Sequence, residues 1–160
     1  MKFHEIETDT IAFPVYSLEI NKLTDLSDIK FPSKHVVLLL AADYSSIPEE
    51  EITNLSIQLI TQGLKYILCW GVECEKAHDA FDLGNILWEE QMNTQNHVMS
   101  TWHNDESFED TLWFCLYNAS PDDEYWSTTS IVVVSIANTI TQQQIGYIDD
   151  VRALNRAVGV

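Results

Sequence analysis

Three runs of consecutive apolar residues constrain the fold of this chain more than any other feature of its sequence. Residues 35–42 read HVVLLLAA, residues 66–70 read YILCW and residues 131–137 read IVVVSIA. Uninterrupted β-branched and aliphatic runs are typical of strands that are buried on both faces, whereas a half-exposed strand alternates apolar with polar residues. The chain therefore needs covering elements on both sides of a central sheet.

Amphipathic segments follow the first two runs. After the first run, Ser46-x-x-Glu49 resembles a capping box, and the apolar helical stripe behind it ends at Gly63. After the second run, a further helix is predicted to begin near Glu73. Residues 84–96 fit either an extension of this helix or a loop.

The second half of the chain repeats this alternation. Residues 97–102 (HVMSTW) predict another strand, Ser107-x-x-Asp110 resembles a capping box, and residues 141–157 predict a last helix. A β-α order of this kind favours parallel strands joined by right-handed crossovers. The predicted fold is α/β, a three-layer Rossmann-like or flavodoxin-like sandwich with a mostly parallel sheet of four or five strands.

The length of the chain indicates one domain. Its 160 residues suit a single α/β domain, 1–160, with a lead-in over 1–34 and a repeating β-α core over 35–157. Within the lead-in, residues 10–20 alternate well enough to predict a possible edge strand. Pro14 argues against a central strand there, because proline cannot donate to a sheet ladder.

The charge balance limits the classes of partner. Eight Lys and Arg residues face 25 Asp and Glu residues, which gives a formal net charge of −17. Binding to nucleic acid needs clustered basic residues, so nucleic acid is not an expected partner. A protein with a basic surface or a cation is compatible with this charge, and so is solubility alone.

The sequence also predicts a cytoplasmic location without membrane contact. No apolar run follows the start of the chain, and the longest apolar stretch, 36–42, is too short to span a bilayer. The three cysteines are odd in number and irregularly spaced, which does not describe a disulfide framework.

Side chains that could act in catalysis or bind a metal follow the predicted strands, and ligands of open α/β sheets bind at these strand ends. One hypothesis is acid–base catalysis by Asp43, His78, His103 and Asp105, although no activated nucleophile accompanies them. A metal site is a weaker candidate. Cys74 and His78 have i, i+4 spacing and His103 could join them, but this is not zinc-finger spacing, and core packing explains the cysteines as well.

Nucleotide binding has no support, because the sequence contains neither a G-x-G-x-x-G motif nor a P-loop. No cofactor is expected. Protein binding has more support, since tryptophans surrounded by acidic residues are typical of interface hot spots. Packing of these tryptophans on the helix layer is the alternative explanation. The candidate binding residues are Trp70, Glu75, Asp79, Trp102, Glu106 and Trp126.

Three stretches together resemble a known family: VVLLLAADYS, CWGVECEKAHDAFD and STWHNDESFEDTLWF. They are similar to small acidic bacterial proteins that are classed only as a domain of unknown function. The resemblance covers roughly the central half of the chain and implies no activity. It groups the residues at the predicted strand ends in one recurring pattern.

The sequence thus favours a non-enzymatic interaction domain, of the immunity or defence-accessory type, whose partner is a protein with a basic surface. The alternative is a metal-dependent or acid–base enzyme with its site around His78 and His103.

Overall fold

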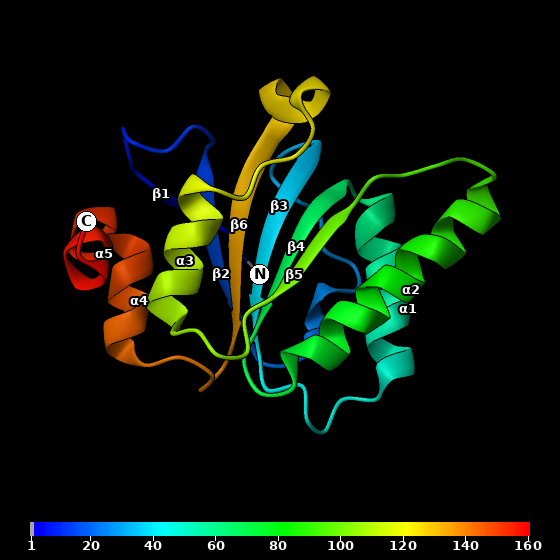
Figure 1. The fold of residues 1–160 in the computed structure, drawn as a ribbon, viewed down its shortest axis with the longest axis horizontal. Helices are drawn as coiled ribbons and strands as arrows, with labels where there is room; N and C mark the ends of the chain where they lie inside the picture. The colour runs from blue at the N-terminus through cyan, green and yellow to red at the C-terminus, as the bar shows by residue number, and fades with distance from the viewer. Residues whose placement is uncertain (1) are drawn as a thin grey trace.

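The computed structural model describes residues 2–160, which form a six-stranded mixed sheet and five α-helices (Figure 1). The strand order is β1-β2-β6-β3-β4-β5. Strand β1 runs antiparallel to β2, and all other neighbouring strands are parallel. The strands are β1 (His4–Ile6), β2 (Val15–Ile20), β3 (His35–Ala41), β4 (Leu64–Trp70), β5 (Met99–Trp102) and β6 (Thr129–Ile136).

Helices cover both faces of this sheet (Figure 1). The 3-10 helix η1 (Leu23–Leu26) packs with α1 (Glu49–Thr61) and α2 (Cys74–Met92) on one face. On the other face lie α3 (Phe108–Tyr117), α4 (Gln142–Asp149) and α5 (Val151–Val158). A second 3-10 helix, η2 (Asp123–Thr128), leads into β6. Within residues 2–160, no helix combines the length and the apolar composition needed to cross a membrane.

The helix layers on both faces of the sheet explain why β3 is apolar along its whole length. Its side chains alternate between a cluster under α1 and α2, which includes Leu38 and Leu40, and a cluster under α3 to α5, which includes Val37 and Leu39. Because both faces are buried, neither set of positions tolerates polar residues. The predicted buried strands at 35–42, 66–70 and 131–137 are therefore confirmed, with small changes at their ends.

The lead-in contributes more to the sheet than its sequence suggested. The sheet has six strands rather than four or five, and β2 lies inside it, between β1 and β6. The predicted edge position was wrong because Pro14 lies just before the strand. Its lack of an N–H group therefore removes no hydrogen bond from the sheet. Its carbonyl instead accepts a hydrogen bond from the amide of Ile131, at 2.8 Å.

Three helix ends differ from the predicted ones. Helix α1 begins at Glu49 with Pro48 as its N-cap, so the predicted capping box at Ser46 does not form. Helix α2 continues to Met92, which resolves most of residues 84–96 as helix. The predicted last helix is broken at Asp150, whose carboxylate accepts hydrogen bonds from the amides that start α5.

Candidate functional site

The carboxyl ends of β3 and β4 form a tightly connected rim. Gly71, at φ +121°, allows this, because a Cβ there would lie 1.8 Å from the carbonyl oxygen of Ala42. The amide of Tyr44 donates to the carbonyl of Val72 at 2.9 Å. The next residue, Glu73, has a positive φ of 57° and precedes α2. Backbone geometry therefore fixes where α2 leaves the sheet.

Many of the acidic residues at this rim lie in the first turns of helices. The first turn of α1 carries Glu49, Glu50 and Glu51, and the first turn of α3 carries Glu109 and Asp110. Carboxylates at these positions complement the positive end of the helix dipole. Helix stabilisation accounts for these charges without a ligand.

A hollow of about 450 Å³ opens at the rim beside the start of α2. Cys74, Glu75 and Asp79, all predicted site residues, line it together with Lys76 and Asn104. Among residues 2–160, no group of three or more His, Cys, Asp or Glu side chains has the geometry to hold a metal ion.

The imidazole of His103 is nearly sealed inside the protein, with a side chain that is 5% exposed. Its Nδ1 donates to the carboxylate of Glu106 at 3.0 Å, and its Nε2 lies 2.9 Å from the hydroxyl of Thr101. The ring packs against Phe114 of α3. His103 therefore ties the β5–α3 loop to the face covered by α3.

His78 lies on α2 with a side chain that is 13% exposed. Its Nδ1 is 3.0 Å from Asp79, and its Nε2 is 3.5 Å from Asp82. The ring contacts Trp102 of β5, with centroids 4.4 Å apart. His78 thus ties α2 to the edge of the sheet.

The two histidines predicted to share a site face opposite sides of the sheet. His78 and Trp102 meet under α2, whereas His103 and Thr101 face α3. Asp43 is exposed, and hydrogen bonds from the hydroxyl and amide of Ser45 lower the pKa of its carboxyl. Asp105 is also exposed.

All three cysteine thiols are buried. Burial raises the pKa of Cys69 and Cys115 strongly and also raises the pKa of Cys74, which the amide of His103 partly offsets. The neighbouring hydroxyl of Tyr44 donates to the carbonyl of Leu40 at 2.7 Å. Thiols held in the protonated form are poor nucleophiles and poor metal ligands.

Of the two predicted binding tryptophans outside β5, Trp70 supports the rim and Trp126 lies away from it. The indole of Trp70 donates to the carbonyl of Glu106 at 3.0 Å and packs edge-on against Phe108. Trp126 belongs to η2, which precedes β6 and so lies at the opposite, amino-terminal end of that strand. Its indole donates to the carbonyl of Pro121, and its ring contacts Phe13.

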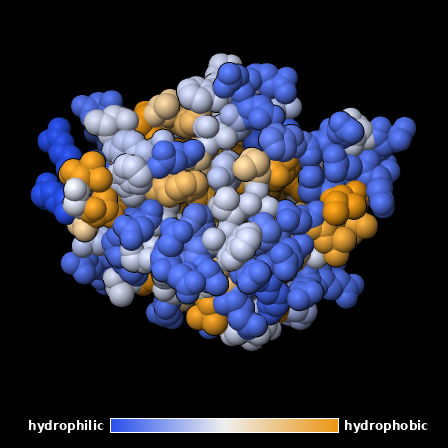
Figure 2. All heavy atoms as spheres, in the orientation of Figure 1, coloured by the Kyte–Doolittle hydropathy of each residue, from blue (hydrophilic) through white to orange (hydrophobic). Residues whose placement is uncertain are grey.

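Glu75, Asp79 and Trp102, in contrast, share one exposed surface, which we call the α2–β5 face. Its centre is apolar and its ends are acidic, and Figure 2 shows the apolar patch over α2. The apolar members are Leu83, Ile86 and Leu87 of α2, and Trp102 of β5 lies at the edge of this surface, against His78. Leu83 and Ile86 are about half exposed, at 49% and 51%.

Sequence reasoning missed the three aliphatic residues of this face. They stand between the inward positions Phe81, Gly84 and Trp88, at a spacing that places them on the outer side of the helix. The signal was present in the i, i+3, i+4 pattern, but residues 84–96, which include Ile86 and Leu87, were predicted only as either a helix extension or a loop.

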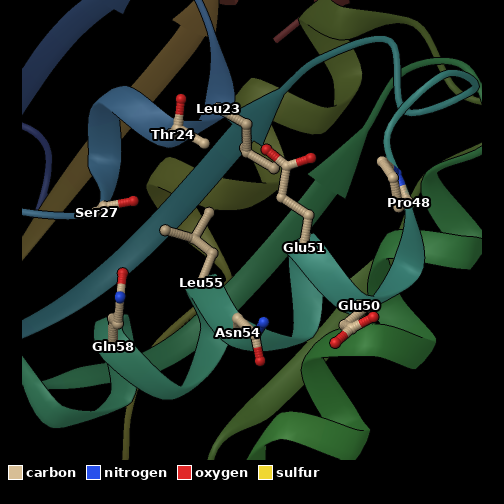
Figure 3. A pocket seen from close by; sticks show the side chains of 9 residues that line it. All are labelled: Leu23, Thr24, Ser27, Pro48, Glu50, Glu51, Asn54, Leu55 and Gln58. Carbon is tan, nitrogen blue, oxygen red and sulfur yellow. The ribbon is translucent and has the colours of Figure 1, made fainter.

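A groove of about 410 Å³ lies between η1 and the start of α1 (Figure 3). Leu23 and Leu55 approach each other across it, and the Glu51 carboxylate lies beside Leu23, while the Glu50 side chain points away (Figure 3). An apolar floor next to a carboxylate suits the stem and ammonium of a lysine side chain.

Comparison with known proteins gives a family but no activity. A family model described as "Domain of unknown function (DUF7684)" matches residues 15–148. This range runs from the start of β2 into α4 and so includes the rim and the α2–β5 face. A search of curated proteins found no match.

Proposed function

The chain belongs to this family of domains of unknown function. Starting from that membership, we propose that it is a non-enzymatic interaction domain. It would bind a protein with a basic surface through the α2–β5 face. The partner would present a segment with apolar residues at its centre and Lys or Arg residues on either side. One observation carries the proposal: the apolar stripe on α2 has acidic residues at both of its ends.

The apolar centre supports a hot spot. Monomeric surfaces rarely expose several large apolar side chains side by side. On this face Leu83, Ile86 and Leu87 are adjacent on α2, which packs along β5 through the Asp82–Ser100 hydrogen bond. Burying them against a partner would remove apolar surface from water.

The acidic ends support the choice of a basic partner. Glu75 and Asp79 precede the apolar stripe by one to two turns, and Glu89 and Glu90 follow it. On a chain with a net charge of −17, few basic residues oppose this field. Complementary charge at an interface rim increases the association rate and excludes acidic competitors.

The proposal includes the finer aspects of fold and location. Helices on both faces support a three-layer sandwich of the Rossmann-like or flavodoxin-like type. A cytoplasmic, bacterial protein that contacts neither membrane nor nucleic acid fits the composition.

The test compares two baits in a lysate of the organism that encodes the chain. The wild type and a Leu83→Glu/Ile86→Glu variant are used to capture proteins at low and high sodium chloride. Any protein that discriminates between the baits is then purified and titrated calorimetrically. We expect the double substitution to weaken binding by about tenfold or more, and higher salt to weaken it further.

Val160→Glu is the control, because it adds a glutamate, half the charge of the double variant, at an exposed aliphatic residue outside this face. The proposal fails if no captured protein distinguishes the double variant from the wild type and the Val160→Glu control. It also fails if the purified complex is indifferent to salt.

A further inference from the structure

A separate hollow lies where β3 and β4 begin, at the opposite end of the strands from the rim. Its volume is about 430 Å³. The walls come from the segment before β3, the end of α1, Trp88 of α2 and Asn96. Gly63, at φ +107°, permits this arrangement, because a Cβ there would lie 2.0 Å from the carbonyl oxygen of Lys34.

Basic residues gather at this hollow. Lys30, Lys34 and Lys65 line it, which is three of the eight Lys and Arg residues in a chain with 25 acidic ones. His35 lines it as well. We call this site the lysine pocket. These basic residues stand out because the molecule as a whole is strongly acidic.

The ammonium of Lys65 is held in place inside the pocket. It donates to the side-chain oxygen of Asn96 at 2.9 Å and lies 4.2 Å from the centre of the Tyr125 ring. Asn96 is itself fixed by Glu89 and Asn85, at 2.7 and 2.9 Å. Lysine has three donors, and among residues 2–160 Asn96 is the only hydrogen-bond acceptor of this ammonium.

The local potential is positive at His35. Burial lowers the pKa of His35, and the charges of Lys65 and Lys34 lower it further. Glu124 acts in the opposite direction but with the smallest effect. Partial burial also lowers the pKa of Lys65, against the pull of Glu124 and Asp122. At His35 the charges of the two lysines therefore outweigh that of Glu124, whereas at Lys65 the neighbouring charges are those of the carboxylates.

We propose that the lysine pocket binds a small organic molecule through its phosphate or carboxylate group. Lys65 would be the pre-positioned donor, and the exposed side chains of Lys30 and Lys34 would close on the anion. Charge-assisted hydrogen bonds from fixed donors are the strong ones in anion recognition. The site does not depend on the α2–β5 face or its partner.

The test is a titration of the ¹⁵N-labelled protein, followed by the shifts of its amide signals. Inorganic phosphate is the probe in one arm and citrate in the other, with ionic strength held constant by sodium chloride. We expect saturable shifts confined to residues around the pocket, such as Lys34, Gly63 and Asn96. The arm with the tighter binding identifies the preferred anion.

Lys30→Gln/Lys34→Gln tests the charge, because both side chains are exposed and their loss leaves the core intact. The double variant should bind about tenfold more weakly. Lys76→Gln, which removes one lysine from the rim, should bind as the wild type does. The proposal is overturned if neither anion saturates by about 10 mM, if the double variant binds as tightly as the wild type, or if Lys76→Gln loses as much affinity.

Discussion

At the scale of single residues, His103 illustrates how a chemically capable side chain can be used for structure. Both of its ring nitrogens have partners within the protein, Glu106 and Thr101, and its ring packs on Phe114. His103→Ala would leave a cavity and remove the partner of a hydroxyl. We expect it to lower the free energy of unfolding by about 2–3 kcal/mol, measured by guanidinium denaturation.

His97→Ala is the comparison for this prediction. His97 also pairs with a carboxylate, Asp122 at 3.0 Å, but both side chains are largely exposed. Its loss should change the stability by less than about 0.5 kcal/mol. Equal effects of the two substitutions would contradict the structural role of His103.

The cysteines make a second prediction at this scale. Because burial raises the pKa of all three thiols, little thiolate is present at neutral pH in the folded protein. A disulfide reagent such as Ellman's should therefore react slowly with the native protein and release three equivalents after unfolding in guanidinium. A thiol in the native protein that reacts as fast as free cysteine would contradict this prediction.

At the scale of elements, the contact between α1 and α2 depends on Gly84. A Cβ at this position would lie 1.6 Å from the hydroxyl oxygen of Ser56, so the two helices approach closely there. Alanine is the better helix former by about 1 kcal/mol. The steric clash with Ser56 should nevertheless cost more than the gain in helix propensity. We expect Gly84→Ala to destabilise the protein by about 1–3 kcal/mol.

Gly146→Ala provides the matched control in the same denaturation experiment. Gly146 lies inside α4, and a Cβ there meets no atom within 4 Å. This substitution should stabilise the protein by about 0.5–1 kcal/mol. If both substitutions shift the stability in the same direction, the close packing of α1 on α2 at Gly84 is not what limits that position.

The strands with the clearest signal in the sequence were those buried on both faces. β3 and β6 carry long apolar runs, so their existence and burial followed directly. β5 was predicted over residues 97–102, although it is a four-residue edge strand with no such run, whereas the three-residue edge strand β1 was not predicted. The inner position of β2 depends on tertiary pairing with β6, which no local pattern contains.

The candidate site was harder to predict because β5 is short and its burial pattern is mixed. Nothing in residues 97–102 indicates which face each side chain takes, so His78 and His103 could be assigned to one end of the sheet but not to opposite faces. The lysine pocket was not predicted from the sequence for a different reason. Lys30 and Lys34 are separated from Lys65 by the whole of β3 and α1.

At the scale of the whole molecule, the net charge of −17 opposes folding through repulsion among carboxylates. Added salt screens this repulsion, because the Debye length falls from about 30 Å at 0.01 M to about 8 Å at 0.15 M. We expect the melting temperature to rise as sodium chloride is raised over this range in calorimetry. A melting temperature that is constant or falls would indicate that attractive pairs offset the repulsion.

The two ends of the sheet have a consequence for self-assembly. At one end the sheet stops at β1, a three-residue strand that runs against its neighbour; at the other it stops at β5. Fibre growth by sheet extension would need β5 of one copy to pair with β1 of the next, along a stretch too short to hold two molecules together. Two β5 strands could pair about a twofold axis, which would leave only the three-residue β1 strands at the outer edges of the joined sheet. The shortness of β1 therefore limits the growth of this sheet by edge-to-edge pairing.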